Sequence, residues 1–307
     1  MLGYSNLVSV LQIDVQTFDI NIVGELKAHN SILSCVCNIP TTSMIISGDD
    51  IGNVKLWDLN YMRCLEGEKI AKNLHQIICH DNKLVYADSR INVVLMEHSG
   101  SSGAESSIYP SKCDEEVYGI YQFFRKEDET LWVITRKDAR KISLKNGRTT
   151  ERFVLCNSEE EISAAGELYN GFVIGTSKGE LSKYGLNGSQ KWKISAHDSE
   201  INTIKIDMEN HLIGTLGGDN NMILWSEKAI LDKENNVRKK ITFKGKDINL
   251  FEVCPYSNLI LISSTNDKVL QFWNYDTLKL IQTIEMPSFI SSFIILPDKA
   301  LIIVSSV

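Results

Sequence analysis

The sequence contains no apolar run that approaches the roughly 18–20 residues of a membrane-spanning helix. Its N-terminal residues, Met1 to Asn6, lack the basic segment and apolar stretch of a secretory signal. The seven cysteines include no CxxC pair, and their odd number favours reduced thiols over a disulfide framework. We therefore expect an intracellular protein, cytoplasmic or nuclear, with no membrane span.

An excess of basic charge is also absent. The chain has 32 Lys and Arg against 39 Asp and Glu, which gives a net charge of −7. Nucleic-acid binders usually carry a basic excess, so this balance disfavours nucleic acid as a partner. Only five prolines leave little room for linkers, and 307 residues suit either two domains or one large all-β architecture.

The chain does contain a repeat. Short apolar segments rich in β-branched residues return along its whole length, as buried strands would. They cover residues 44–48, 84–88, 131–135, 172–176, 212–215, 259–264 and 301–306. The repeats start about 43 residues apart on average. A period of roughly 40–45 residues with several strands per unit is typical of a β-propeller blade.

The period predicts an all-β fold, a seven-bladed β-propeller that occupies residues 1–307 as a single domain. The expected blades lie near 29–70, 73–110, 115–155, 160–195, 197–244, 246–286, and 288–307 plus 5–26. Two N-terminal strands would pair with the C-terminal half-blade, which closes the ring and removes open sheet edges. The alternative is a fragment cut within a blade, but the surplus at one end matches the deficit at the other.

Three repeats carry a finer spacing that ends at a tryptophan. A His lies 28 residues before it, a Ser or Thr 10 residues before it, and an Asp 6 residues before it, although only one repeat has all of these. The residues are His29, Ser47 and Trp57 in the first repeat, His197, Thr215, Asp219 and Trp225 in the fifth, and Ser263, Asp267 and Trp273 in the sixth.

With Trp57-Asp58 closing the first of them, these repeats resemble the WD-repeat β-propeller family. The resemblance implies that the residues form structural tetrads, in which each buried polar group finds a hydrogen-bond partner. Two repeats depart from the pattern. Ile51 stands at the Asp offset of the first, with Asp50 one residue early, and Gly245 replaces the His of the sixth. The other four repeats keep the strands without the tetrad.

No catalytic, cofactor or metal site emerges from the sequence, and we expect no enzyme activity. Ser, His and Asp gather at the tetrad offsets, which favours a structural role over a nucleophilic triad. Cys35 and Cys37 would share one face of a strand, but a closed zinc site needs about four ligands, and free thiols usually pack as small apolar groups. The Gly217-Gly218-Asp219 segment joins two strands and so does not form a phosphate loop.

Carboxylates recur in the loops that lead into the blades. In the family these loops share one face of the propeller, so the resemblance implies a charged surface able to steer a basic partner. The predicted acidic rim consists of Asp49, Asp50, Asp114, Glu115, Glu116, Glu159, Glu160, Glu161, Asp198 and Glu200. Such carboxylates can also serve solubility alone. The third blade's turn places Arg136, Lys137 and Arg140 on the same face, which counts against the rim.

A basic cluster accompanies the long insertion at 231–240 in the fifth repeat. Its members, Arg238, Lys239, Lys240, Lys244 and Lys246, could contact phosphates of nucleic acid or lipid, but an ordinary charged hairpin is the favoured reading. Phosphoinositide-binding members of the family carry Phe-Arg-Arg-Gly, whereas residues 124–127 read Phe-Arg-Lys-Glu. Cullin-ligase receptors of the family often show Trp-Asp-x-Arg, whereas residues 57–60 end in Asn. Both roles are therefore disfavoured.

These observations predict a non-catalytic protein-interaction scaffold that serves as a subunit of an intracellular multiprotein complex. The alternative is a peptide reader that binds a basic segment, for example a histone tail, at its acidic top face. The two differ in the surface that they need. A reader requires a pocket at the pore mouth with an aromatic or acidic trap, whereas a scaffold requires a broad apolar patch on a rim or side.

Overall fold

The computed structural model describes residues 7–14, 17, 19–27, 29–39, 42–72, 74, 76–80, 83–87, 91–95, 108–110, 121–125, 130–143, 148–157, 159–208, 210–231, 237–243, 248–254, 258–264, 267–296 and 300–306. Within these residues the chain is almost entirely β-structure, with one short helix. The predicted all-β class is confirmed.

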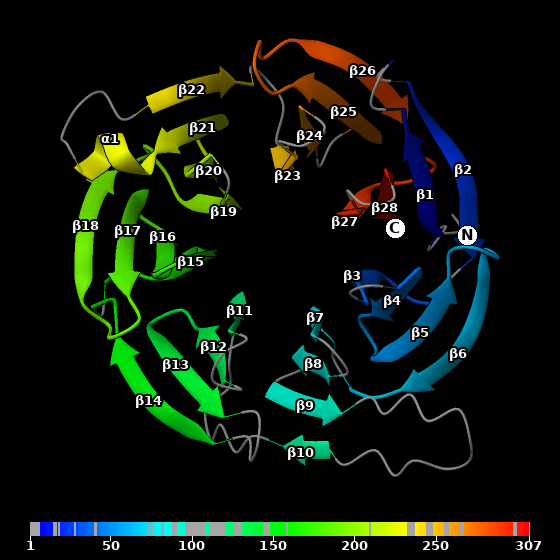
Figure 1. Ribbon diagram of the computed structural model, residues 1–307, viewed down its shortest axis with the longest axis horizontal. Coiled ribbons are helices and arrows are strands. Elements are labelled where there is room, and N and C mark those ends of the chain that lie inside the picture. Colours follow the sequence, from blue (N-terminus) through cyan, green and yellow to red (C-terminus); the bar gives the residue numbers. More distant parts are fainter. Residues whose placement is uncertain are drawn as a thin grey trace.

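The strands form four-stranded antiparallel sheets arranged in a ring, with each sheet radiating from the centre (Figure 1). The sheets are given in chain order, each from its innermost strand outward. The first two are β3 (Leu33–Asn38), β4 (Met44–Asp49), β5 (Asn53–Asp58) and β6 (Arg63–Lys69), and then β7 (Gln76–His80), β8 (Lys83–Ala87), β9 (Ile91–Leu95) and β10 (Ile108–Pro110). The next two are β11 (Tyr121–Arg125), β12 (Thr130–Ile134), β13 (Asp138–Ser143) and β14 (Thr149–Val154), and then β15 (Ile162–Leu168), β16 (Gly171–Thr176), β17 (Glu180–Gly185) and β18 (Gln190–Ser195).

The remaining sheets complete the ring. They are β19 (Ile201–Asp207), β20 (Leu212–Gly217), β21 (Asn221–Ser226) and β22 (Val237–Thr242); β23 (Ile248–Cys254), β24 (Leu259–Ser264), β25 (Val269–Asn274) and β26 (Leu280–Glu285); and β27 (Ile290–Leu296), β28 (Leu301–Ser306), β1 (Leu7–Ile13) and β2 (Ile20–Lys27). The helix α1 (Glu227–Leu231) follows β21.

The sequence predicted seven equivalent blades, and this prediction is wrong for the described residues. Six of the sheets have four strands of five or more residues each. In the sheet of the second repeat, the outer strand β10 comprises only Ile108–Pro110. Pro110 has no amide hydrogen to donate to a ladder, which disfavours a longer strand at this position. Within the residues that the structure describes, the ring therefore has six complete blades and one sheet with a three-residue outer strand.

The ring closes where the two ends of the chain pair. β1 lies antiparallel to β28, with Val10 opposite Ile303, so N-terminal and C-terminal strands share one sheet. One face of this closing sheet contributes Val8, Val10 and Ile303 to the core against the first blade. The other contributes Ile302 and Val304 to the core against the sixth repeat's sheet. Both faces are therefore buried, which explains the continuous apolar runs in these strands.

Polar side chains link neighbouring sheets near the centre. Five innermost strands carry a β-bulge near their start, which adds one residue that is Ser or Asn in every case: Ser34, Ser163, Asn202, Asn249 and Ser291. Two of them reach the next sheet, because the Ser163 hydroxyl donates to the Ile201 carbonyl at 2.7 Å and Asn249 Nδ2 donates to the Ile290 carbonyl at 3.4 Å. The bulges at Ser163 and Asn249 thus connect sheets that share no backbone ladder.

The fifth repeat's insertion is shorter than the sequence suggested. It begins with α1, and the outer strand β22 already starts at Val237. Arg238, Lys239 and Lys240 therefore lie within β22, where Lys240 pairs with Ile223 of β21. Lys244 and Lys246 lie outside the described residues.

The buried contacts across the ring closure predict a large stability effect. Replacement of the fully buried Ile303 by Ala should lower the free energy of unfolding by about 2–5 kcal/mol, because it leaves a cavity between the closing sheet and the first blade. The matched control is Val154→Ala at a residue that is 72% exposed, with an expected change within about 0.5 kcal/mol. Urea unfolding measures both. Equal effects of the two variants would contradict the packing described for the closure.

Candidate functional site

The fifth repeat forms a complete hydrogen-bonded tetrad. Trp225 Nε1 donates to Thr215 Oγ1 at 2.8 Å, and Thr215 Oγ1 lies 2.7 Å from His197 Nε2. His197 Nδ1 lies 2.9 Å from Asp219 Oδ1. A neutral His197 with its proton on Nδ1 lets every group in the chain donate or accept. Burial alone would raise the pKa of Asp219, but hydrogen bonds from Asn221 and His197 outweigh it and lower that pKa to about 2.

The first repeat forms the same chain of contacts with a different carboxylate. Trp57 Nε1 donates to Ser47 Oγ at 2.8 Å, and Ser47 Oγ lies 2.7 Å from His29 Nε2. His29 Nδ1 lies 3.1 Å from Asp49 Oδ2. Asp49 is fully buried, so its place in the predicted acidic rim is wrong. Burial lowers the pKa of His29 even though Asp49 opposes the shift.

The carboxylates of the two tetrads, Asp49 and Asp219, come from different positions on the backbone. Asp49 pairs with Leu33 at the end of its strand, and Gly217 pairs with Ile201 at the equivalent place in the fifth repeat. A Cβ atom on Gly217 would lie 2.4 Å from His197 Nδ1, within the space that the imidazole occupies. The contact between histidine Nδ1 and a carboxylate therefore forms in two ways. In the first repeat the carboxylate lies on the strand. In the fifth repeat the strand has glycine at that position, and the carboxylate comes from the turn.

The sixth repeat does not bring its predicted tetrad residues together. Trp273 Nε1 donates to Gln271 Oε1 at 3.2 Å, and the Ser263 hydroxyl donates to Asn249 Oδ1 at 2.8 Å. The cause is a difference in strand register. Trp57 pairs with Ile45, which lies two residues before Ser47. Trp273 pairs with Ile260, which lies three residues before Ser263. One extra residue moves Ser263 to the other face of its strand. The assignment of Ser263 and Asp267 to a tetrad with Trp273 is thereby corrected.

The third repeat has a buried ion cluster that sequence reasoning missed. Asp138 is 1% exposed and accepts hydrogen bonds from Thr135 Oγ1 at 2.6 Å, Arg140 Nε at 2.9 Å and Arg152 Nε at 2.5 Å. Burial would raise the pKa of Asp138, but the Arg140 and Thr135 contacts reverse this and hold it below its usual value. Arg140 is itself buried, so it does not belong to the exposed basic turn expected from the sequence.

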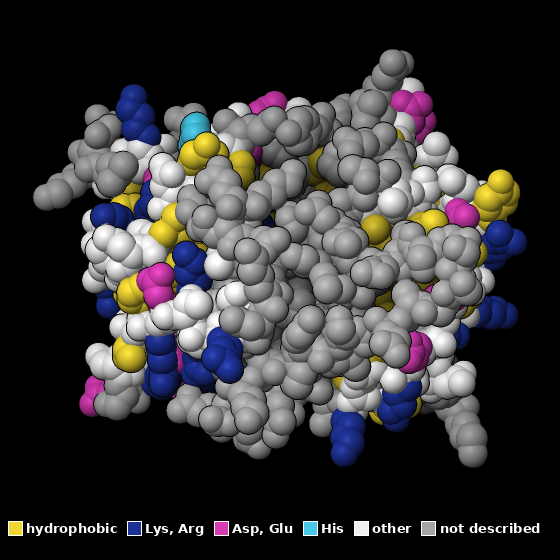
Figure 2. All heavy atoms as spheres, turned by 60° about the horizontal axis from the view of Figure 1, so that its bottom comes forward, with side chains coloured by type: hydrophobic (Ala, Val, Ile, Leu, Met, Phe, Trp, Pro, Cys, Tyr) yellow, Lys and Arg dark blue, Asp and Glu magenta, His cyan; other side chains and the backbone are white. Residues whose placement is uncertain are grey.

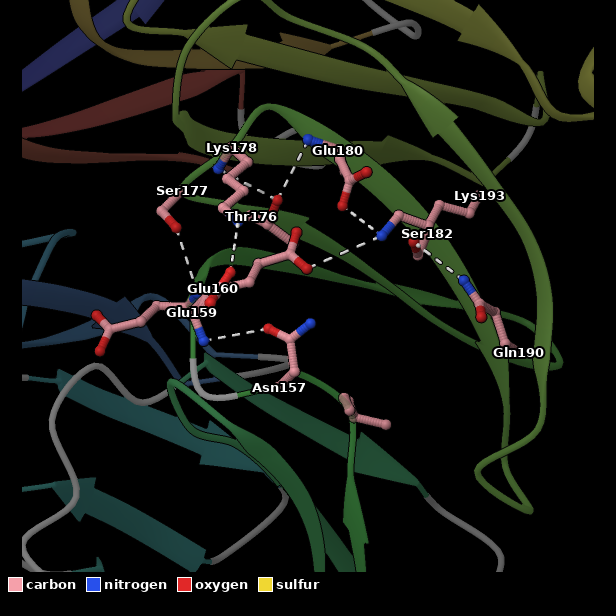
Figure 3. A network of polar contacts seen from close by, with 12 residues as sticks. Asn157, Glu159, Glu160, Thr176, Ser177, Lys178, Glu180, Ser182, Gln190 and Lys193 are labelled. Atoms are coloured by element: carbon pink, nitrogen blue, oxygen red, sulfur yellow. Dashed lines mark hydrogen bonds and ion pairs between the residues drawn. The ribbon is translucent and has the colours of Figure 1, made fainter.

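Each carboxylate in the acidic loop of the fourth repeat has a cation of this chain within 4 Å. Arg136 Nη1 lies 3.2 Å from Glu161 Oε2, Lys178 Nζ lies 3.9 Å from Glu159 Oε2, and Lys193 Nζ lies 3.8 Å from Glu160 Oε2. Figure 3 shows Lys193 between Glu160 and Glu180. This contact with Glu180 raises the pKa of Lys193.

Glu160 in this loop is mostly buried, with 7% exposure, and it is thus part of the blade interior. The other residues of the predicted acidic rim differ in their contacts and exposure. Asp50 accepts a hydrogen bond from the Ser31 hydroxyl, whereas Asp198 and Glu200 are exposed. Asp114, Glu115 and Glu116 lie outside the described residues. On the side of the molecule drawn in Figure 2, the described acidic and basic side chains are intermingled along the edges. The described part of the rim is therefore a mixed surface with a small acidic area at Asp198 and Glu200.

An exposed aromatic lies in the loop before β27. Phe289 is 45% exposed, but Lys268 Nζ lies 5.2 Å from the centre of its ring, at cation–π distance. The Phe289 ring is therefore already in contact with a cation of this chain.

A strip of exposed apolar side chains crosses three neighbouring sheets on the outside of the ring. Its residues, here called the apolar strip, are Leu280 and Ile281 of β26, Ile22 and Val23 of β2, and Tyr61, Met62 and Leu65 next to and within β6. Their exposures run from 36% for Met62 and Ile281 to 72% for Tyr61. Figure 1 shows that β26, β2 and β6 follow one another around the circumference.

Two contacts join the sheets that carry the apolar strip. Gln282 Nε2 donates to the Ile20 carbonyl at 3.1 Å, which joins β26 to β2. Met62 packs over Gly24, where an added Cβ would lie 3.1 Å from its Sδ, and this joins β2 to the first blade. No sequence motif marks these residues, because the contributing segments lie far apart in the chain.

Other chemistry is sparse among the described residues. In the part of the chain that the structure describes, no group of three or more His, Cys, Asp or Glu is placed to hold a metal ion. No helix in that part is long and apolar enough to cross a membrane.

Comparisons with known proteins agree with this architecture. The family model "WD domain, G-beta repeat" matches residues 20–58. WD repeat-containing protein 55 of Arabidopsis thaliana is 24% identical over 246 residues, which are 74% of this chain and 64% of that protein. The CCR4-associated factor 4 homolog of Candida glabrata is 28% identical over 96 residues, 30% of this chain and 16% of that protein. The chain thus spans less than two thirds of the curated relatives that it matches.

A solved structure shares the fold. The β-propeller domain of Myceliophteria thermophila Cps50 (Swd1) superposes with a TM-score of 0.71 over 91% of this chain and 98% of that one, at 14% identity. The ring of sheets and the closure define the class as a β-propeller. The two tetrads and the match at residues 20–58 are features that the chain shares with WD-repeat proteins.

The fifth-repeat tetrad predicts a specific mutational pattern. Thr215→Val removes the hydroxyl that bridges Trp225 and His197 and leaves both without that buried partner. The free energy of unfolding should fall by about 1–3 kcal/mol, because buried groups lose their hydrogen bonds. Thr215→Ser keeps the hydroxyl and should recover most of the loss. Chemical denaturation would refute the structural role of the hydroxyl if Val and Ser variants were equally stable.

Asp219 predicts a pH effect with a defined sign. Its folded-state pKa of about 2 lies below the ordinary value, so its contribution is complete above about pH 4 and is lost as the pH falls towards 2. The stability of Asp219→Asn should therefore change less than that of the natural protein over this interval. Urea midpoints measured from pH 5 to pH 2 test this, and parallel curves for the two proteins would contradict it.

Proposed function

We propose that this chain is a non-catalytic scaffold subunit of an intracellular multiprotein complex, and that the apolar strip is its principal partner surface. The observation that carries the proposal is the exposure of Ile22, Val23, Met62, Leu280 and Ile281 on adjacent sheets. Contiguous exposed apolar surface is costly in water and marks interaction sites in soluble proteins.

The composition of the strip supports a protein partner. Tyr61 and Met62 are of the types enriched at interfaces, and Arg63 lies 5.2 Å from the Tyr61 ring, at the edge of the strip. An apolar centre with a charged border is the usual anatomy of a protein–protein interface. The name of one relative, a CCR4-associated factor 4 homolog, is compatible with such a role.

The alternative, a reader of basic segments, draws less support from the charges. Glu159, Glu160 and Glu161 face cations of this chain, and Asp49 serves the first tetrad. A basic ligand would have to displace these internal pairs. The exposed Asp198 and Glu200 are the described residues of the acidic rim on which that alternative would chiefly rest.

Partner capture distinguishes the two surfaces. Val23→Glu combined with Leu280→Glu places two charges in the apolar strip, and we expect the recovery of specific partners to fall by about tenfold or more. The matched control is Val154→Glu combined with Met208→Glu, which alters exposed apolar residues elsewhere. Affinity purification with quantitative mass spectrometry gives the readout, and urea midpoints verify that both variants fold.

A third variant tests the alternative directly. Reversal of Asp198 and Glu200 to Lys should leave capture unchanged under the scaffold proposal. A salt-dependent loss with this variant, together with full capture by the strip variant, would overturn the proposal in favour of a basic-segment reader.

A further inference from the structure

Two cysteines meet between the first and second repeats. Cys37 lies on β3 and Cys79 on β7, the innermost strands of neighbouring sheets, and their Sγ atoms are 3.3 Å apart. They are 42 residues apart in sequence. The sheets that carry them share no backbone ladder, so side-chain contacts of this kind hold them together. Both cysteines belong to the apolar core between the two sheets, which also includes Leu74 and Ile77.

The two thiols differ in their access to solvent. Cys37 is 8% exposed, whereas Cys79 is only partly buried. The contact with Cys79, together with burial, raises the pKa of Cys37 well above its usual value. A small oxidant would therefore reach Cys79 first, and Cys37 would be the second thiol to react.

We propose that Cys37 and Cys79 form a peroxide-dependent disulfide that covalently joins the first and second sheets of the ring. The observation behind this proposal is the approach of two thiols from separate sheets to 3.3 Å. A disulfide requires an S–S distance of about 2.05 Å, so the sulfurs need to approach by only about 1.3 Å.

The reaction has two balanced steps. The Cys79 thiolate attacks one oxygen of hydrogen peroxide, so an S–O bond forms, the O–O bond breaks, and hydroxide leaves and takes up the thiol's proton as water. Cys37 sulfur then attacks the sulfur of the Cys79 sulfenic acid, so the S–S bond forms and the S–O bond breaks. The departing hydroxide takes the Cys37 proton as a second water. Two thiols are oxidised, and one peroxide is reduced to two waters.

The disulfide would act on the ring rather than on a partner surface. It would close a covalent loop across two sheets that share no backbone ladder, and this restricts the unfolded chain. The oxidised protein should therefore unfold at higher urea concentration than the reduced protein. This inference rests on a different observation from the scaffold proposal, and the failure of one leaves the other intact.

Peptide mapping of the full chain after treatment with hydrogen peroxide provides the test. Trypsin should release residues 28–55 joined to residues 73–83, with the loss of two hydrogen atoms, and fragmentation should place the bond at Cys37 and not at Cys35. Dithiothreitol should reverse the link. The urea midpoint should rise on oxidation in the natural protein and not in Cys79→Ser.

Cys64→Ser is the matched control, because Cys64 is an exposed thiol outside this contact. This variant should form the link as the natural protein does. If Cys37→Ser fails to fold, Cys79→Ser alone carries the test, since its side chain is less buried. The proposal is overturned if peroxide converts Cys79 to sulfinic acid, links it to another cysteine, or leaves both thiols open to alkylation after unfolding.

Discussion

The pairing of β1 with β28 is the constraint on which the rest of the molecule depends. It places the N-terminal strand β2 on the outside of the ring, between β26 and the first blade. Two of the seven residues of the apolar strip, Ile22 and Val23, come from that strand. The proposed partner surface is thus a product of ring closure, because its segments are adjacent only when both ends of the chain occupy one sheet.

Buried polar groups explain how the blades tolerate divergence. The first and fifth repeats satisfy the tryptophan and histidine through tetrads with carboxylates from different backbone positions. The third repeat instead surrounds Asp138 with Arg140, Arg152 and Thr135. In the sixth repeat, the indole N–H of Trp273 donates a hydrogen bond to Gln271. In these four repeats different combinations of side chains supply hydrogen-bond partners to the buried groups named here.

Much of the fold follows from the sequence, because strands buried between sheets produce apolar runs and the blade size sets their spacing. The complete tetrad at His197 and Trp225 follows from spacing as well. The carboxylate of the first tetrad does not, since Asp49 reaches His29 from a strand position that the family spacing assigns to no carboxylate. Ser263 fails because a single extra residue reverses the face of a strand.

Surface properties were harder to predict for a different reason. The sequence suggested that Glu160 and Glu161 are free charges, because their partners Lys193 and Arg136 approach them only in the folded structure. The strip likewise combines residues near positions 22, 62 and 280 that carry no common motif. The sheet of the second repeat, with its abbreviated β10, shows that strand period alone does not establish that every blade is equivalent.

Hydrogen–deuterium exchange of the protein in complex with its captured partner tests the central claim most directly. The account predicts slower exchange on binding within residues 20–27, 61–69 and 280–285, the segments that build the apolar strip. Protection confined to the loops at 159–161 and 198–200, with unchanged exchange in those three segments, would contradict it.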